Sequence, residues 1–214
     1  MTNPHIQSEE KMEAITELRG GIYKLLADCF VTPDEDFHTR IGQLQEALAL
    51  RYPDTEVYPE NRFPDLGKGV ADAPGLESLK VEHARLFVGP FSLEAPPYGS
   101  VYMEKSEHLM AESTMHVQQW YESEGMELAI HDVPDHIRIE LEFVCYLIIR
   151  EHEAEDPGNW RKKQRSFLEQ HLARWIAQFE NKVRESDETG LYAMLAEATS
   201  RFVRSDLEHL QRKW

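Results

Sequence analysis

The sequence has few cysteines and no long apolar run. Only Cys29 and Cys145 occur among the 214 residues. Each lies inside an apolar helical pattern, so we expect two buried free thiols rather than a disulfide framework. No uninterrupted apolar stretch approaches the roughly 18 residues of a membrane-spanning helix. The first twelve residues are polar and acidic, unlike a secretory or transit signal. These features predict a cytoplasmic protein without stable membrane insertion.

Basic residues are few relative to acidic ones. The chain has 23 Lys and Arg against 39 Asp and Glu, which gives a formal net charge of −16. A field of this sign repels nucleic-acid phosphates and anionic lipids and attracts cationic segments. We therefore expect no nucleic-acid partner and favour a basic peptide.

The common motifs of nucleotide and zinc chemistry are also missing. Residues 67–69 read Gly-Lys-Gly but lack the upstream glycine and the hydroxyl of a phosphate-binding loop. There is no His-Glu-x-x-His motif and no paired-cysteine motif. One alternative stays open, because Glu112 with His116 and His136 with Glu140 are spaced to share a helix face. The competing hypothesis is a helical metal-dependent oxidoreductase or hydrolase that uses these four residues.

The apolar pattern has a helical period throughout. No segment alternates convincingly with period two, whereas steps of three and four predict a first helix from about Ser8 to Val31. The Thr-Pro-Asp-Glu sequence at 32–35 has the capping signature of a second helix that runs to about Arg51. Four prolines and two glycines then predict an irregular loop over 52–74.

Further helices are expected over 76–87, with a stop at Gly89, and over 109–125. Asp132 is expected to cap the next helix, with Pro134 in its first turn.

The last third of the chain predicts two more helices. Asn159 is expected to cap a helix whose wide apolar face continues to Val183, and Gly190 restarts the final one. The length fits one domain with a sizeable core. The predicted fold class is therefore all-α, a single-domain helical bundle of about six to nine helices over residues 1–214.

Two segments are not explained by core packing alone. Residues 82–102 combine an aromatic helix end, a diproline and two tyrosines, the composition of a preformed surface that clasps an extended chain. A well-packed surface loop has the same composition. The second segment is Pro-Asp-His at 134–136. Its Asp can cap a helix, and its His can tie down a loop or titrate near neutrality.

Together these segments carry a family resemblance. The chain reads LFVG at 86–89, PPYGSVY at 96–102, PDH at 134–136 and ELEF at 140–143, with LMAEST at 109–114 between them. In this order the motifs resemble the signature of the TorD/DmsD/NarJ family, the cytoplasmic maturation chaperones of molybdenum-cofactor oxidoreductases. The match is specific from about Glu82 to Phe143 and weaker elsewhere.

The resemblance implies an all-helical chaperone that is not an enzyme and has no cofactor of its own. Its implied partner is a molybdoenzyme catalytic-subunit precursor, bound through its twin-arginine-type signal peptide, its body or both. The chaperone would assist cofactor insertion and prevent premature export. The residues expected to bind or border the peptide come from the family motifs: Leu86, Phe87, Gly89, Pro96, Pro97, Tyr98, Ser100, Tyr102, Pro134, Asp135, His136 and Glu140.

The oligomeric state follows from neither the composition nor the resemblance. A Pro-rich hinge allows helices to be exchanged between two copies, and 52–74 is the segment where that exchange is expected. Monomer and helix-exchanged dimer are both retained.

Overall fold

The computed structural model describes residues 4–53, 62–89, 92–104, 112–129 and 133–212. These residues form ten α-helices and one π-helical turn, and no strand occurs among them. The elements are α1 (Pro4–Cys29), α2 (Phe37–Arg51), α3 (Leu66–Asp72), α4 (Leu76–His83), η2 (Ala84–Val88), α5 (Gly99–Met103), α6 (Glu112–Ser123), α7 (Ile137–Glu153), α8 (Pro157–Gln170), α9 (Leu172–Ser186) and α10 (Leu191–Arg212). The all-α prediction is confirmed, although the number of helices exceeds six to nine.

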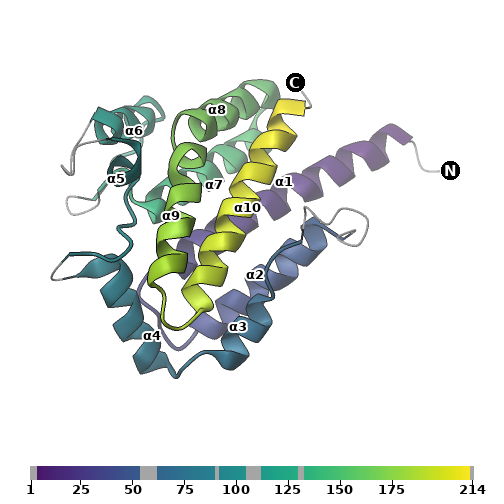
Figure 1. The fold of residues 1–214 in the computed structure, drawn as a ribbon. Coiled ribbons are helices and arrows are strands. Elements are labelled where there is room, and N and C mark those ends of the chain that lie inside the picture. Colours follow the sequence, from purple (N-terminus) through teal and green to yellow (C-terminus); the bar gives the residue numbers. More distant parts are fainter. Residues whose placement is uncertain (1–3, 54–61, 90–91, 105–111, 130–132, 213–214) are drawn as a thin grey trace.

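The long helices α1, α7, α8, α9 and α10 pack together in the centre of the molecule (Figure 1). On one side α2 packs against α1, and α3 packs against α2 and α10. On the other side α5 lies between α6 and α9. Segments far apart in the sequence therefore meet around one central stack, since α1 contacts α7 and α3 contacts α10. None of the described helices is long and apolar enough to cross a membrane.

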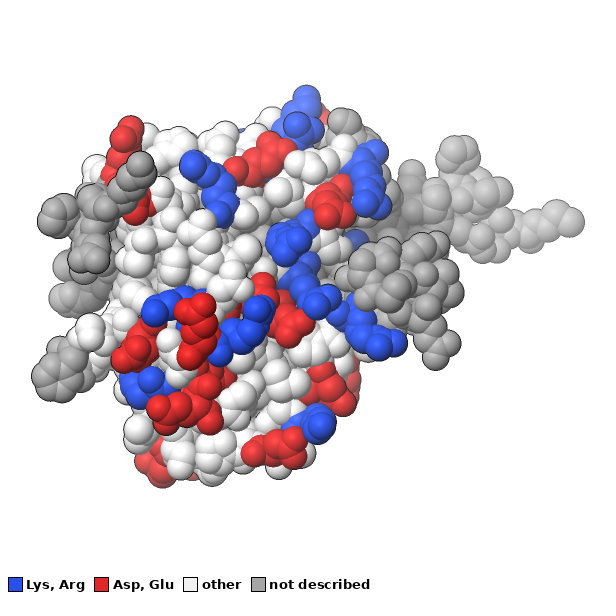
Figure 2. Space-filling view, viewed as in Figure 1, with Lys and Arg blue, Asp and Glu red and all other residues white. Residues whose placement is uncertain are grey.

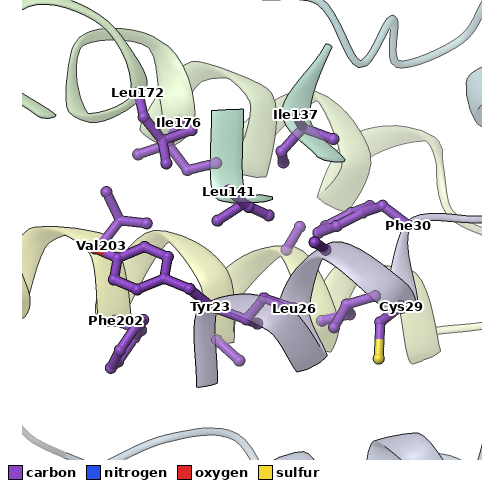
Figure 3. Packing of buried hydrophobic residues seen from close by; sticks show 14 of the residues in the cluster. Tyr23, Leu26, Cys29, Phe30, Ile137, Leu141, Leu172, Ile176, Phe202 and Val203 are labelled. Carbon is purple, nitrogen blue, oxygen red and sulfur yellow. The ribbon is translucent and has the colours of Figure 1, made fainter. Parts of the chain in front are cut away.

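The core lies between α1, α7, α9 and α10 (Figure 3). Tyr23 and Leu26 of α1 face Leu141 of α7, while Ile176 and Phe202 complete the layer from α9 and α10. Each is fully buried, and burying such a side chain contributes about 1.5–3 kcal/mol.

Both cysteines are free and buried, as expected. Burial raises the pKa of Cys29 to about 12. Because the thiolate is the reactive form of cysteine, Cys29 behaves as a small apolar core residue.

The second helix begins later than its capping signature predicts. It starts at Phe37, and the Thr32-to-Glu35 capping box does not form. Instead the Asp34 carboxylate accepts a hydrogen bond from the Asp36 backbone N–H at 3.0 Å and pairs with Arg40 at 2.9 Å. These contacts hold residues 34–36 in a local turn that replaces the predicted capping box.

The predicted loop over 52–74 contains a short helix, α3. The Asp65 side chain caps it by accepting from Lys68 N–H, and the Leu66 N–H donates to the Gln45 side chain at 2.8 Å. A Cβ at Gly69 would lie 2.8 Å from Met194 Sδ, so this glycine lets α3 approach α10 closely. The prediction of a loop without a long regular element misses this seven-residue helix, which is stabilised in part by contacts with α2 and α10. Residues 54–61 lie outside the described residues.

Two later helix starts also differ from the prediction. The helix assigned to Asp132 and Pro134 begins at Ile137 with His136 as its N-cap, and Asp132 lies outside the described residues. At α8 the cap is Asp156, which accepts from Gly158 N–H, with Pro157 in the first turn; Asn159 lies inside the helix. Proline suits the first helical position because no backbone N–H is needed there.

One predicted helix is divided in two. The apolar face that leads to Val183 is split between α8 and α9 by His171, whose backbone has φ −129° and ψ −100°.

The start of the 109–125 helix lies outside the described residues, and Gly125 adopts φ +74° after its end. A positive φ costs glycine little, so its predicted role as a stop is confirmed.

Candidate functional site

The two unexplained segments of the sequence meet in the folded chain. Gly99 N–H donates to the Asp135 carbonyl at 2.9 Å, and Ile137 N–H donates to the Pro97 carbonyl at 2.8 Å. These bonds form an isolated antiparallel bridge between Tyr98 and His136. The diproline segment and the Pro-Asp-His turn are therefore one structural unit.

Asp135 and its neighbours support this unit from inside. The Asp135 side chain is 1% exposed and accepts from Ser100 N–H at 2.7 Å. The Tyr121 hydroxyl donates to the Pro134 carbonyl at 2.9 Å. Ser100 is buried as well. These predicted site residues hold the backbone in place and are not accessible to a peptide.

A second layer lies beneath the bridge and is centred on Trp175 of α9. Its indole stacks on Tyr102 with ring centroids 5.7 Å apart, and its N–H donates to the Glu140 carboxyl group at 3.3 Å. A Cβ at Gly99 would lie 2.8 Å from Trp175 Nε1. The Tyr102 hydroxyl donates to the Pro96 carbonyl at 2.8 Å. Gly99 is thus required for the close approach of the bridge to Trp175.

Glu140 lies in an environment that disfavours its charge. Burial, followed by the neighbouring Asp135 carboxylate, raises the pKa of Glu140 well above the ordinary value of a glutamate. The folded protein therefore keeps Glu140 protonated at pH values where the unfolded chain ionises it. The ordinary pKa of a glutamate side chain is 4.5. By linkage, Glu140 therefore makes the free energy of unfolding fall as the pH rises above that value.

We expect Glu140→Gln to raise the free energy of unfolding at pH 8 by on the order of 1 kcal/mol. Glutamine is neutral and nearly isosteric, and it still accepts from Trp175. Denaturant titrations at pH 5, 6.5 and 8 measure the effect, and the variant should show the shallower pH dependence. A variant less stable than the wild type at pH 8 would contradict a protonated Glu140.

Tyr98 and His136 form the outer surface of the bridge. Both side chains are half-buried, and their rings meet edge to face at 5.3 Å. They line an open cavity of about 400 Å³, which we call the Tyr98–His136 cleft. The lining residues are Phe30, Val31, Thr32, His83, Tyr98, Val133, His136, Arg138 and Ile139.

The cleft has a mixed polar and apolar lining and an acidic neighbour. Thr32 lines the cleft, and the residues just after it form an exposed turn that contains Asp34, Glu35 and Asp36. Arg138, another lining residue, pairs with Glu142 at 3.0 Å. The cleft therefore combines apolar and polar side chains in its lining with negative charge on the adjoining turn.

His83 lies at the floor of the cleft and is held neutral. Its Nε2 lies 3.3 Å from the Phe30 carbonyl oxygen, and burial lowers the pKa of its imidazole. A neutral His83 places no positive charge against an incoming basic segment.

Leu86 and Phe87 do not contribute to a groove surface. They are 0% and 4% exposed, and the Phe87 ring packs against Phe30 and Tyr192. Gly89 ends η2 with φ +82°. The expectation that Leu86 and Phe87 shape a groove directly is wrong, because the π-helical turn directs both side chains into the core.

Among the predicted residues, Tyr98 and His136 line the cleft, while half-buried Pro96 and Tyr102 lie close to the bridge. Pro97, Pro134 and Glu140 are buried beside them. Several lining residues are not predicted from the sequence: Phe30, Val31, Thr32, His83, Val133, Arg138 and Ile139. No spacing in the sequence connects them with Tyr98, since only the folded chain brings them together.

The four residues of the competing metal-enzyme hypothesis do not form a metal site together. Glu112 and His116 line a second cavity beside α6, whereas His136 lies at the cleft and Glu140 below the bridge. In the described part of the chain, no group of three His, Cys, Asp or Glu side chains could hold a metal ion. The four residues are not assembled into one centre.

Comparison with known proteins identifies relatives along most of the chain. Residues 33–181 match the family model described as nitrate reductase delta subunit. The chaperone protein TorD of Vibrio vulnificus is 25% identical over 94% of this chain and 98% of its own length. The Tat proofreading chaperone DmsD of Salmonella paratyphi A is 32% identical over 48% of each chain.

A solved structure shares the fold. The redox enzyme maturation protein of Archaeoglobus fulgidus superimposes with a TM-score of 0.54 at 23% identity, over 86% of this chain and 93% of that one. The family model covers more than half of the chain, and the similar sequences are named as chaperones. The chain therefore belongs to the TorD/DmsD/NarJ family of molybdoenzyme maturation chaperones.

Proposed function

We propose that the Tyr98–His136 cleft binds the signal peptide of a molybdoenzyme catalytic-subunit precursor in the cytoplasm. Binding holds the precursor until its cofactor is inserted and prevents premature export. The observation that carries the proposal is the bridge itself. It joins the two signature segments and places a half-buried aromatic pair, Tyr98 and His136, at the edge of an open cavity.

The chemistry of the cleft suits the two parts of such a peptide. A twin-arginine-type signal peptide has a basic front and an apolar middle. Val31 and Val133, both half-buried in the lining, offer apolar contact to the middle, at about 25 cal/mol per Å² of buried apolar surface before ordering costs. The acidic turn at 34–36 attracts the basic front.

The acidic turn should act mainly on the rate of association. We expect the double variant Glu35→Lys/Asp36→Lys to lower the association rate of a signal peptide by about 3–10-fold at low salt, because charge steers the encounter. The difference should disappear near 1 M salt, where the Debye length falls to about 3 Å. Stopped-flow mixing with a fluorescent peptide measures both values.

A matched control changes the same charge elsewhere. Glu197→Lys/Glu208→Lys alters two acidic residues of α10 that pair with arginines of the same helix. If this control slows association as much as the turn variant, net charge rather than the acidic turn governs the encounter.

The direct test of the proposal is a calorimetric titration with the client identified first. The precursor that co-purifies with this chain from its native cell supplies the signal-peptide sequence, which is then synthesised. The wild-type chain should bind this peptide, and a peptide with its basic front neutralised should bind more weakly. Failure of the wild type to bind the synthetic peptide would reject the proposal. The choice between monomer and helix-exchanged dimer stays a prediction.

A further inference from the structure

A partly buried ion pair lies at the start of the first signature segment. Glu82, near the end of α4, is 5% exposed and accepts two hydrogen bonds from the Arg85 guanidinium, at 2.8 and 2.7 Å. Figure 2, viewed as in Figure 1, shows acidic and basic side chains crowded together over the region of α4 and the lower end of α9. Exposed ion pairs contribute little to a fold. The Glu82–Arg85 pair differs from them because its carboxylate is buried and both partners also bind another part of the chain.

Both members of the pair bind the loop that joins α9 to α10. The Glu82 carboxylate accepts from the Glu188 backbone N–H at 2.8 Å, and the Arg85 guanidinium donates to the Ser186 carbonyl. Burial opposes ionisation of Glu82, but the hydrogen bonds from Arg85 and from the Glu188 N–H outweigh it and lower the pKa of this carboxyl below its usual range. Glu82 is therefore ionised at pH 7, and charge-assisted hydrogen bonds of this kind are stronger than neutral ones.

The α9–α10 loop is itself held by local hydrogen bonds. The Asp187 carboxylate accepts from Thr189 N–H and from Ala193 N–H, both at 2.8 Å. A side chain that accepts from the first backbone N–H groups of a helix fixes the entry of the chain into that helix. The ion pair therefore attaches η2 to a loop whose own backbone is held in place.

The end of η2 continues the connection toward the cleft. The last carbonyls of a helix have no partner within the helix. Here the Arg85 carbonyl accepts from Glu94 N–H at 3.4 Å, and the Leu86 carbonyl accepts from Ala95 N–H at 3.0 Å. Two prolines, whose φ angles are fixed, separate Ala95 from Tyr98. The place of η2 therefore determines where the chain enters the bridge.

Apolar packing is the other interaction that holds η2. The Phe87 ring packs against Phe30 and Tyr192. Hydrophobic contact is not directional, whereas hydrogen bonds to a planar guanidinium fix an orientation. The ion pair can therefore set the orientation of η2, which packing alone leaves less defined.

We propose that the Glu82–Arg85 pair is a positioning element of the Tyr98–His136 cleft. It holds η2 against the α9–α10 loop, and η2 in turn holds residues 94–95, which lead into the bridge. The lining of the cleft includes neither member of the pair, so the pair acts through Tyr98 and not on the peptide. The inference rests on the proposed function only for its ligand, since the order of the bridge can be measured without a peptide.

The test begins with Arg85→Met in the full-length chain, which removes the guanidinium and keeps an unbranched stem. We expect signal-peptide affinity to fall by about 3–10-fold, because apparent affinity decreases with the fraction of molecules that hold a competent site. Without peptide, the Gly99 and Ile137 amides of the bridge should exchange hydrogen at least about tenfold faster, as measured by NMR. The amides of Val144 and Phe202 in the core should stay within about twofold of the wild type.

Two further variants serve as controls for charge and geometry. Arg165→Met removes a guanidinium that is 44% exposed and pairs with Glu169 along α8, so it should change neither the affinity nor the exchange of the bridge. Arg85→Lys keeps the positive charge but loses the planar fork that binds both carboxylate oxygens. We expect its affinity and its bridge exchange to lie between those of the wild type and Arg85→Met.

A double variant controls for a general loss of stability. Arg85→Met leaves the Glu82 carboxylate buried without its counter-charge, which can destabilise the whole protein. Glu82→Gln/Arg85→Met removes both charges together, and glutamine still accepts from the Glu188 N–H. We expect this variant to melt near the wild-type temperature and still to show the faster exchange at Gly99 and Ile137.

Three outcomes would overturn the inference. Unchanged bridge exchange and affinity in the folded double variant would mean that apolar packing alone positions the cleft. Equal acceleration at every amide would give the pair only a general structural role. Weaker peptide binding with unchanged bridge exchange would make Arg85 a direct peptide contact. If the wild type binds no signal peptide, the proposed function fails, while the exchange rates still decide whether the pair positions the bridge.

Discussion

Replacing Asp206 with alanine is expected to lower the free energy of unfolding by about 3–5 kcal/mol. Asp206 is fully buried in α10 and pairs with Arg19 of α1 through both oxygens, at 2.7 and 2.9 Å. It also accepts from the Tyr23 hydroxyl at 3.1 Å. Truncation leaves the 3% exposed Arg19 without its closest counter-charge in the core, which costs far more than the loss of a surface pair.

Denaturant titration monitored by circular dichroism measures this loss. The matched control is Glu208→Ala in the same helix, whose exposed pair with Arg212 should contribute less than about 0.5 kcal/mol. Arg19 also lies 2.9 Å from the Gln164 side chain and 3.6 Å from Glu151. If Asp206→Ala costs less than about 1 kcal/mol, these neighbours compensate the charge and Asp206 is not its main partner.

The second large effect is expected at the cleft, where Tyr98→Ala combined with His136→Asn should weaken signal-peptide binding by at least about 30-fold. Partly buried aromatic side chains in a cavity are the usual energetic centres of a peptide interface. Asparagine is chosen at 136 because it can replace the imidazole as N-cap of α7, where His136 accepts from Arg138 N–H. The fold should therefore survive both changes.

Calorimetry on the double variant measures this affinity, and thermal melting confirms that the protein is folded. Val101→Ala is the control, because Val101 is 38% exposed on the neighbouring helix α5 and does not line the cleft. Double-variant affinity within twofold of the wild type would reject the cleft as the binding site. Asp135→Ala does not serve this purpose, since Asp135 is buried and its loss tests folding.

The buried faces of the long helices can be predicted from the sequence alone. The steps between Ile137, Leu141, Val144 and Ile148 predict a buried face, and all four side chains are buried in α7. The helix starts are less accessible, because they depend on which of several capping residues is engaged. Asp156 rather than Asn159 caps α8, and tertiary contacts create α3.

The candidate site, too, can be predicted only in part from the sequence. The motifs identify Tyr98 and His136, which share the bridge, and the resemblance predicts that the two segments act together. The motifs cannot distinguish exposed from supporting residues, so Leu86 and Asp135 appear equivalent to Tyr98 although both are buried. Phe30 escapes detection because its contact with the cleft depends on how the end of α1 packs.

The most direct test of the central claim is to map the bound signal peptide by photo-crosslinking. A synthetic peptide with p-benzoylphenylalanine in its apolar middle is irradiated with the full-length chain, and the cross-linked residues are identified by mass spectrometry. We expect cross-links to Tyr98, Val133, His136 and residues 31–32, which the unlabelled peptide competes away. Competed cross-links confined to α6 and the α8–α9 junction, or to α4 and α10, would contradict it.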